Sequence, residues 1–294
     1  MKFSIQDFNK EFPDDDACLD RIFQMKFGDL DTCPKCETKT KFHRVSERRQ
    51  YACQNCGHQI APCVGTPLEK SSTSLQKWFY AMYLFTSSEH GVPAKELERQ
   101  LSVTYKTAWR MGHELRKLLG NINGDGDQTL DGHVEMDETF IGGKAKAKPG
   151  AAEKYKATVL GILQRDGRVK TRLIKGRGRK HIEPMLTKYV PWGTTVSTDE
   201  AGDMMFVSML PYEHGRVNHR RKEWKRGIHH TNGIEGYWSR LKCSIKGTHV
   251  HVSEKHLQKY TEEFSFRYDN RKVGHAAMFD CALSGIVLQH PKAD

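Results

Sequence analysis

The chain has 294 residues, and its 47 Lys and Arg against 36 Asp and Glu give a formal net charge of +11. This length exceeds the usual size of one domain, so two or three compact units are expected. No run of about 18 apolar residues is present to cross a membrane, and the first ten residues lack the apolar stretch of a secretory signal. We therefore expect a cytoplasmic, multidomain α+β protein whose positive charge suits a polyanionic partner.

The positive charge is concentrated in a few segments. Residues 214–230 carry six Arg or Lys, four His and one acid, and two further basic runs span 144–156 and 175–180. A solvated loop is the simpler interpretation of each run, and we prefer it for 144–156, which is rich in Ala, Gly and Pro. The first segment supplies candidate nucleic-acid contacts. They are Arg220, Arg221, Lys222, Lys225 and Arg226.

Two Cys-x-x-Cys pairs stand near the N-terminus, with 16 residues between them. This spacing predicts one structural, tetrahedral zinc site in a zinc ribbon, with strands at 42–44 and 49–52 returning the second pair to the first. Two disulfides are the alternative, which a reducing cytoplasm disfavours. Cys63 is expected to be a small buried residue rather than a fifth ligand. The four predicted zinc ligands are Cys33, Cys36, Cys53 and Cys56.

Residues 71–119 are expected to form three helices. Leu75 and Phe79 begin the apolar stripe of the first, and the second spans about 93–101. Ser102 is placed to N-cap the third. A short helix, a tight turn and a helix with a polar, basic start are the layout of a helix-turn-helix, with a plain helical hairpin as the alternative. The candidate DNA contacts are Tyr105, Lys106 and Arg110.

A polar, Gly-containing linker at 121–132 precedes a C-terminal half with alternating apolar patterns. Three strands are expected first, then a helix, a fourth strand and further helices. This βββαβ order is the ribonuclease-H-like α/β arrangement, in which acids from the first and fourth strands and a later helix converge. The expected elements are strands at 134–140, 157–163, 169–174 and 194–198, and helices at 181–189, at 201–210 and from 232 onward.

Acidic residues stand at the three places that this arrangement brings together. Asp137 lies in the first strand, Asp199 ends the fourth, and Glu235 begins one face of the last helix. Lys242 and Lys246 follow on the face of Glu235, so a carboxylate is followed by two ammonium groups. This pattern suits a metal ligand whose neighbours hold DNA phosphates.

Three motifs make a family resemblance specific. Residues 136–144 read MDETFIGGK, residues 197–202 read STDEAG, and residues 230–242 read HTNGIEGYWSRLK. With the paired cysteines and the SVTYKTAWRM segment at 102–111, they resemble bacterial insertion-sequence transposases that carry an N-terminal zinc ribbon, the relatives of the Merlin transposons. The resemblance covers the chain from about residue 10 to about residue 275.

The resemblance implies a DNA transposase with a DDE triad. The triad would be Asp137, Asp199 and Glu235, with 35 residues between the last two. Three carboxylates can hold two Mg²⁺ or Mn²⁺ ions around one phosphodiester. The expected partners are double-stranded DNA of transposon ends and of the target, and at least a homodimer on DNA, because two ends must be joined. The expected location is the bacterial cytoplasm, at the nucleoid.

The two strand acids have rivals. Glu138 could be the ligand in place of Asp137, although the strand geometry favours Asp137. Glu200 could replace Asp199, but it is more simply a first-turn helix acid beside a positive dipole end.

Glu235 has the strongest alternative to a role as metal ligand. Asn232-x-x-Glu235 is a capping-box pattern, in which the Glu would only satisfy backbone donors. Tyr237 is expected to pack or to contact DNA rather than to act as a nucleophile. His229 and His230 are left out of the catalytic set, because loop histidines are commonly exposed.

Two rival functions remain: a DNA-binding regulator with an inactive ribonuclease-H-like domain, and a ribonuclease-H-like nuclease without strand transfer.

The expected organisation has three functional modules. The expected segments are an N-terminal helical segment (1–29), a zinc ribbon (30–66), a helix-turn-helix domain (67–120), a linker (121–132), a catalytic domain (133–275) and a C-terminal tail (276–294).

Overall fold

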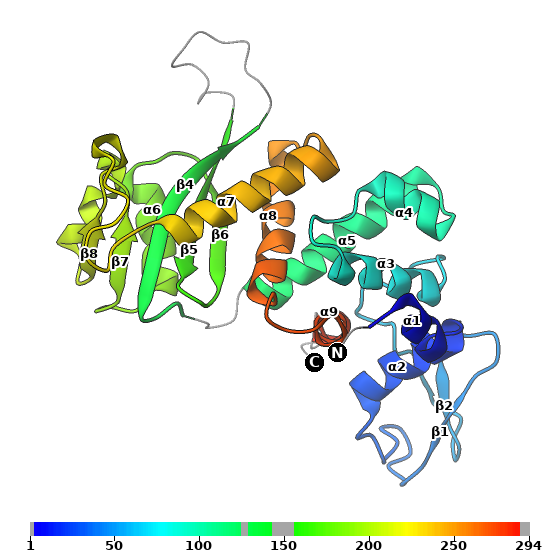
Figure 1. The fold of residues 1–294 in the computed structure, drawn as a ribbon. Helices are drawn as coiled ribbons and strands as arrows, with labels where there is room; N and C mark the ends of the chain where they lie inside the picture. Colours follow the sequence, from blue (N-terminus) through cyan, green and yellow to red (C-terminus); the bar gives the residue numbers. More distant parts are fainter. Residues whose placement is uncertain (1–2, 125–128, 143–155, 289–294) are drawn as a thin grey trace. The chain divides into compact units, whose positions relative to one another are not determined.

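The structure is a computed structural model that describes residues 3–124, 129–142 and 156–288 (Figure 1). The basic run expected as a loop at 144–156 lies, except for its last residue, outside the described residues. No helix among the described residues is long and apolar enough to cross a membrane. The chain divides into two compact units. Unit 1 comprises Met1–Ser88, Ala94–Leu118 and Val273–Asp294, and unit 2 comprises Glu89–Pro93 and Leu119–Lys272.

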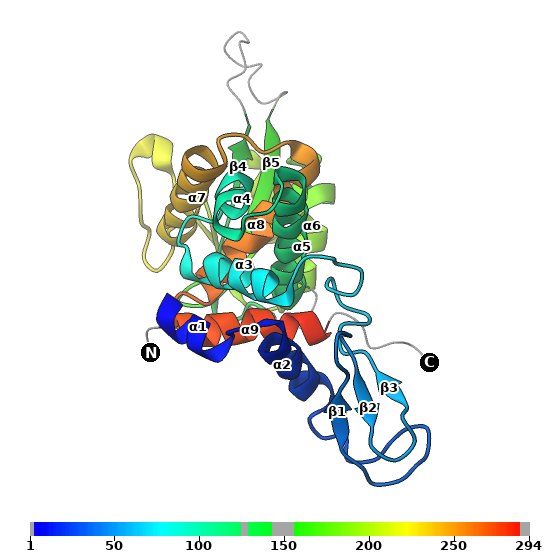
Figure 2. The same cartoon turned by 90° about the vertical axis from the view of Figure 1, so that its right-hand side faces the viewer.

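Unit 1 holds helices and a small antiparallel ribbon. The ribbon has the order β1-β2-β3, and the three strands are visible side by side in Figure 2. Its elements are α1 (Ile5–Glu11), α2 (Asp15–Phe27), β1 (Phe42–Arg44), β2 (Tyr51–Cys53), β3 (Gln59–Ile60), α3 (Leu75–Ser87), α4 (Ala94–Leu101), the start of α5 (Tyr105–Gly124) and α9 (His275–Leu288).

The hairpin predicted between the cysteine pairs is confirmed, with different bounds for its second strand. Its first strand matches the prediction, whereas the second begins at Tyr51 rather than at residue 49. The sequence analysis missed β3, because two residues are too few to show an alternating pattern.

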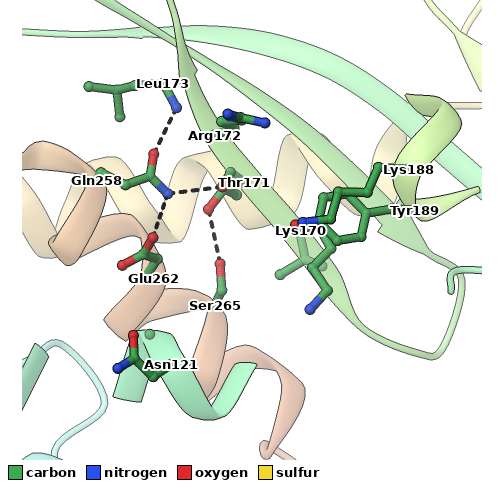
Figure 3. Close-up of a pocket in the computed structure, with 12 residues that line it drawn as sticks. Asn121, Lys170, Thr171, Arg172, Leu173, Lys188, Tyr189, Gln258, Glu262 and Ser265 are labelled. Carbon is green, nitrogen blue, oxygen red and sulfur yellow. Dashed lines mark hydrogen bonds between the residues drawn. The ribbon is translucent and has the colours of Figure 1, made fainter. Parts of the chain in front are cut away.

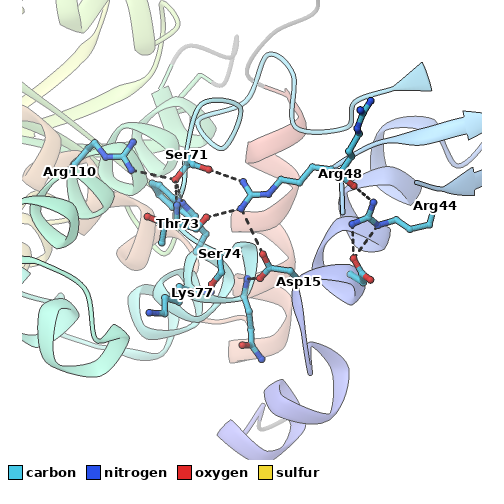
Figure 4. A network of polar contacts seen from close by, with 12 residues as sticks. Asp15, Arg44, Arg48, Ser71, Thr73, Ser74, Lys77 and Arg110 are labelled. Atoms are coloured by element: carbon cyan, nitrogen blue, oxygen red, sulfur yellow. Dashed lines mark hydrogen bonds and ion pairs between the residues drawn. The ribbon is translucent and has the colours of Figure 1, made fainter. Parts of the chain in front are cut away.

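Polar contacts attach this ribbon to the helices of unit 1. The Arg49 guanidinium donates to the carbonyl oxygens of Ser71 and Thr73, both at 2.9 Å (Figure 4). Arg44 Nη2 lies 2.7 Å from Asp16 Oδ1 on α2. The ribbon is therefore part of the same compact unit as the helices that precede and follow it.

The segment expected as a C-terminal tail is, up to Leu288, instead part of helix α9 (His275–Leu288). Its Phe279 is 2% exposed and contacts the rings of Phe8, Phe12 and Phe79. Burial of several aromatic side chains stabilises this helix in unit 1. Apolar residues at Met278, Phe279, Ala282, Leu283 and Ile286 have helical spacing, so the pattern was present in the sequence.

The turn between α4 and α5 differs from the prediction in its cap. Ser102 does not cap α5, because it adopts a left-handed conformation with φ of 48° in the turn itself. Thr104 takes the N-terminal position, since its hydroxyl oxygen accepts from the Thr107 N–H at 3.3 Å. The helix, turn and helix that the sequence predicted are otherwise present.

Unit 2 is built on one five-stranded sheet with the order β6-β5-β4-β7-β8. The first three strands pair antiparallel, whereas β7 pairs parallel with β4, and β8 pairs parallel with β7. Its elements are β4 (His133–Ile141), β5 (Ala157–Gln164), β6 (Val169–Ile174), α6 (Arg179–Tyr189), β7 (Thr195–Thr198), η2 (Gly202–Met209), β8 (Glu213–Arg216), η3 (His219–Arg221), α7 (Asn232–Ser244), η4 (Ile245–His249) and α8 (Glu254–Asp269).

The βββαβ order is the predicted one, but two later elements differ. The helix expected at 201–210 is a 3₁₀ helix, η2. The sequence analysis missed β8, whose residues are polar and only partly buried, so that no apolar alternation marks it.

The alternation of β4 divides its side chains between two apolar cores. Val134 and Met136 pack into the core under α6 and η2. Glu135 and Asp137 therefore point to the opposite face, where α7 and α8 cover the sheet. This second core contains Ile234, Trp238 and Leu241 of α7, so the predicted buried stripe of this helix is confirmed.

Strand β6 is an edge of the sheet, and a glutamine side chain on α8 bonds to two of its backbone groups. Gln258 Oε1 accepts from the Leu173 N–H at 2.8 Å, and Gln258 Nε2 donates to the Thr171 carbonyl at 3.1 Å (Figure 3). The same amide donates to Glu262. The residues that make these contacts line a cavity of about 450 Å³. They also cover the edge of the sheet, which prevents further strand pairing there.

Candidate functional site

The four cysteines predicted to bind zinc lie together. Their sulfur atoms all lie within 4.8 Å of one another, with Cys33 Sγ 3.7 Å from Cys56 Sγ and Cys36 Sγ 3.9 Å from Cys53 Sγ. A tetrahedral zinc with bonds of about 2.3 Å places its sulfurs about 3.8 Å apart, so the cluster fits the ion. Disulfides, which require about 2.05 Å, are absent from these residues. Cys63 is buried outside the cluster, as predicted.

Asp137 and Asp199 come from neighbouring parallel strands. In the β4–β7 register, Glu135 is paired with Ser197, and continuing that register by two residues sets Asp137 beside Asp199. Neighbouring strands lie about 4.8 Å apart. Burial, followed by the charges of Asp199 and Glu138, raises the pKa of Asp137 to about 7. The structure therefore brings these two carboxylates into one site.

Close packing of α7 on the sheet orients Asp137. Trp238 Nε1 donates to Asp137 Oδ2 at 3.0 Å. The indole lies over Gly161, the partner of Asp137 on β5, where an added Cβ would stand 2.6 Å from the ring. Only glycine leaves room for this approach. Sequence reasoning missed both Gly161 and the role of Trp238, which depend on a contact between distant segments.

Lys242 follows Trp238 by one helical turn and lies within range of the charge of Asp137. Burial lowers the pKa of the Lys242 ammonium, while the charge of Asp137 opposes that change. The Lys246 charge also acts on Lys242, and Lys246 itself is exposed in η4. The predicted succession of two ammonium groups beyond Glu235 is present in α7 and η4.

The rival acids have other partners. Glu138 pairs with Arg177, whose Nε lies 3.2 Å from Asp203 Oδ2. Glu200 accepts from the backbone N–H groups of His219 at 2.9 Å and Arg220 at 3.3 Å. Glu200 is therefore not simply a first-turn acid of the following helix, because it caps η3, which is remote in sequence.

Glu235 is held at the start of α7 by side chains. Its Oε1 accepts from Thr231 Oγ1 at 2.9 Å and lies 3.5 Å from His219 Nδ1. The capping-box interpretation is wrong, because the N-cap is Thr231 rather than Asn232 and makes no side-chain capping bond. Asp137, Asp199 and Glu235 do not form a set whose oxygens all lie within 4.8 Å; among the described residues only the cysteines form such a set.

A buried charge network fixes the N-terminus of α7. Glu135 is fully buried, and its Oε1 lies 2.9 Å from Arg165 Nε and 3.1 Å from His230 Nδ1. Its Oε2 accepts from the Ile234 N–H at 3.0 Å. Arg165 also donates to the carbonyl oxygens of Ile228 at 2.7 Å and of His230 at 3.2 Å. The sequence analysis missed the pair of Glu135 and Arg165, because each residue by itself resembles an ordinary charged residue of a strand or a turn.

The two loop histidines are partly buried structural groups. His229 Nδ1 lies 3.0 Å from Ser197 Oγ, and Ser197 Oγ lies 2.7 Å from His133 Nε2. Burial and the Arg165 charge lower the pKa of His229. The expectation that these histidines are exposed is therefore wrong, although they remain outside the catalytic set. Tyr237 is buried and contacts Ser265 Oγ at 3.0 Å, which confirms its packing role.

The residues predicted to contact DNA lie mostly on exposed surfaces. Tyr105, Lys106 and Arg110 are exposed on the first turns of α5. Trp109, which the sequence analysis did not select, is 41% exposed on the same helix. In unit 2, the exposed cations gather on and after η3. They are Arg220, Arg221, Lys222, Lys225 and Arg226.

Comparison with known proteins gives matches over most of the chain. Residues 129–269 match the ISXO2-like transposase domain, and residues 13–59 match the transposase zinc-ribbon domain. The uncharacterized protein in transposable element ISH50 of Halobacterium salinarum (strain ATCC 700922 / JCM 11081 / NRC-1) is 24% identical over 290 residues, which cover 92% of this chain and 96% of that protein.

Among solved structures, a similar chain occurs in the cryo-EM structure of the simian T-cell lymphotropic virus intasome in complex with PP2A regulatory subunit B56 gamma. It is 11% identical, with a TM-score of 0.26. The match covers 70% of this chain and 64% of that chain.

Removal of zinc should unfold the ribbon selectively. Because residues 30–60 bury little apolar surface, metal binding contributes much of their folding free energy. We expect chelation to release one zinc per chain and to increase hydrogen exchange there, with much smaller changes in unit 2. Cys53→Ser should have the same effect, and Cys63→Ser serves as the matched control. A zinc-free chain that stays protected at 30–60 would contradict the prediction.

Replacing Asp137 by Asn should stabilise the metal-free protein above neutral pH. The folded-state pKa of Asp137, about 7, exceeds its ordinary value of 3.8. Protonated Asp137 therefore stabilises the folded state. This contribution is fully present below pH 3.8 and is lost as the pH rises through about 7. We expect Asp137→Asn to raise the unfolding temperature more at pH 8 than at pH 5, by about 2–4 °C per kcal/mol. Exposed Asp166→Asn is the matched control, and an equal gain at both pH values would contradict the prediction.

Proposed function

The chain belongs to the zinc-ribbon transposases of insertion sequences, and we propose that it binds transposon ends and performs divalent-metal-dependent DNA cleavage and strand transfer. The observation that carries this proposal is the position of Asp137 on β4 and of Asp199 directly after the neighbouring parallel strand β7, with Asp137 bonded to the helix that bears Glu235. A metal site made of these carboxylates requires the fold to bring together segments that are far apart in sequence.

The donor set of the site fits Mg²⁺ or Mn²⁺. Asp137, Asp199 and Glu235 offer hard carboxylate oxygens, which these ions prefer. Burial, followed by like-charge repulsion from Asp199, raises the pKa of Asp137, and a bound cation would relieve that repulsion. Two ions held there would activate an attacking water or DNA 3′-hydroxyl and stabilise the leaving oxygen.

The neighbouring residues have defined parts in this proposal. Trp238 keeps Asp137 oriented through its indole N–H. Lys242, whose ammonium lies within range of the charge of Asp137, would bind a phosphate oxygen near the scissile bond. Lys246, exposed beyond it, would contact the same DNA backbone. No side chain is needed as a covalent nucleophile.

We assign unit 2 a ribonuclease-H-like fold. Its support is the βββαβ order, with three antiparallel strands followed by a parallel fourth strand. The assigned catalytic domain is 133–275, after a linker at 121–132. The two-unit division ends the second unit at Lys272, close to that boundary.

We assign α4 and α5 to a helix-turn-helix in the domain 67–120. The exposed Tyr105, Lys106 and Arg110 would face the major groove, because recognition helices present their N-terminal side chains to DNA. The zinc ribbon, proposed at 30–66 after the helical segment 1–29, would supply further contacts to transposon ends. Strand transfer joins two ends, so at least a homodimer should assemble on DNA.

Two other functions make different predictions. A DNA-binding regulator with an inactive domain would show no metal-dependent cleavage. A nuclease without strand transfer would cut ends but would not join them to target DNA. Incubation with Mg²⁺ and DNA carrying the element's own ends, with cut and joined products scored separately, distinguishes the three functions.

Asp137→Asn should abolish Mg²⁺-dependent cutting of transposon ends and leave their binding intact. Loss of one metal ligand removes several kcal/mol of transition-state stabilisation, so we expect a fall of roughly three orders of magnitude. The measurement is single-turnover cleavage together with end affinity in a gel-shift assay. Asp166→Asn is the matched control and should cut normally. Normal cleavage by Asp137→Asn would refute the site.

Lys242→Ala should weaken DNA binding on all sequences and lower its dependence on salt. Each phosphate contact contributes a slope of about 0.9 in the logarithmic plot of affinity against salt. Fluorescence anisotropy at several salt concentrations measures that slope. Lys188→Ala on α6, which lies on the other face of the sheet, is the matched control. An unchanged slope would remove Lys242 from the phosphate contacts.

A further inference from the structure

A large aromatic side chain is exposed beside the candidate site. Trp224 is 55% exposed, and it follows η3 in the segment between β8 and α7. Its ring packs against the imidazole of His219, with 4.8 Å between the ring centroids. The indole is thereby in contact with protein on one side, while much of its surface remains open to solvent.

The segment that carries Trp224 is held at both ends. At its start, Glu200 accepts from the backbone N–H groups of His219 and Arg220. At its end, Arg226 and His229 exchange two backbone hydrogen bonds of 2.9 Å around a turn in which Gly227 has φ of 58°. The backbone on both sides of the exposed indole is therefore anchored by hydrogen bonds.

The same contacts place Trp224 next to the proposed catalytic acids. His219, on which the indole packs, lies 3.5 Å from Glu235 Oε1. Glu200, which holds the His219 backbone, directly follows Asp199. A single side chain, that of His219, therefore connects Trp224 to Glu235. The His219 backbone is in turn bonded to Glu200, in the loop that bears Asp199.

The surroundings of Trp224 are strongly cationic. Exposed cations occupy five of the seven positions from 220 to 226. The acid among these residues, Glu223, is paired with Arg226, with 3.1 Å between Glu223 Oε1 and Arg226 Nε. An aromatic ring within a positive surface is the arrangement that binds single-stranded nucleic acid, because the cations hold phosphates and a base stacks on the ring.

We propose that the indole of Trp224 binds an unpaired nucleobase of the DNA end, next to the scissile phosphate. The inference rests on the proposed function, since it requires DNA in the carboxylate site. Stacking on Trp224 offsets part of the free energy that is needed to take a base out of the duplex. The base stays near the phosphate because His219 links the stacking ring to Glu235.

An abasic scan tests the proposal directly. Duplexes of the element's terminal DNA carry a single abasic nucleotide at each position that flanks the cleavage site. Affinity is measured in the Asp137→Asn background, so that the readout does not depend on cleavage, and single-turnover cleavage is measured with otherwise unmodified protein. Each DNA is tested with the protein that retains Trp224 and with the Trp224→Ala and Trp224→Phe variants.

With intact DNA, Trp224→Ala should reduce affinity and cleavage roughly ten-fold, within the range caused by the loss of one base–aromatic stack. Trp224→Phe should lose less, because it keeps an aromatic ring. At one abasic position the penalty of Trp224→Ala should disappear, because no base remains there to stack. Trp192→Ala is the matched control, since Trp192 is 57% exposed before β7, at the end opposite Asp199.

A penalty that persists at every abasic position would overturn the proposal, and so would the absence of any effect of Trp224→Ala. An equal loss in Trp192→Ala would show a general effect of losing an exposed tryptophan and would also overturn it. Failure of the proposed function is distinguishable, because the unaltered chain would then leave intact ends uncut.

Discussion

The packing of helix α7 against strands β4 and β5 is the constraint on which the candidate active site depends. Gly161 permits Trp238 to approach the sheet, and the Trp238 indole N–H then reaches Asp137. The same helix carries Glu235 one turn earlier and Lys242 one turn later. A shift of α7 would therefore move Glu235, the indole that holds Asp137 and the ammonium proposed to bind phosphate together, and small displacements of this kind reduce catalysis strongly.

A buried ion pair holds that helix at its N-terminal end. Glu135 binds Arg165 and the Ile234 N–H, and Arg165 reaches the carbonyl oxygens that precede α7. Removing one partner of such a pair typically costs about 3–5 kcal/mol, since a charge is left buried without compensation. The sheet thus positions α7 through two contacts on β4, an ion pair at residue 135 and an indole hydrogen bond at residue 137.

In unit 2, the segment around η3 brings the proposed DNA contacts close to the proposed catalytic acids. Glu200, a rival ligand in the sequence analysis, instead anchors η3 beside the acids. The anchored segment presents Trp224 and a run of cations, and His219 joins it to Glu235. In unit 1, Arg49 and Arg44 bind the ribbon to the rest of the unit. The four-cysteine cluster and the exposed start of α5 therefore belong to one compact unit.

The sequence by itself determined the zinc cluster, the βββαβ order and the strand positions of Asp137 and Asp199, because spacing and alternation are local properties of the chain. Only the tertiary structure decided the roles of Gly161 and Glu135, because each role is a contact with a helix that begins about 70 residues or more further along the chain. It also decided that the expected tail is helix α9, since the burial of Phe279 needs partners from the N-terminal segment. Contacts between distant segments have no period in the sequence, so they emerge only when the chain is folded.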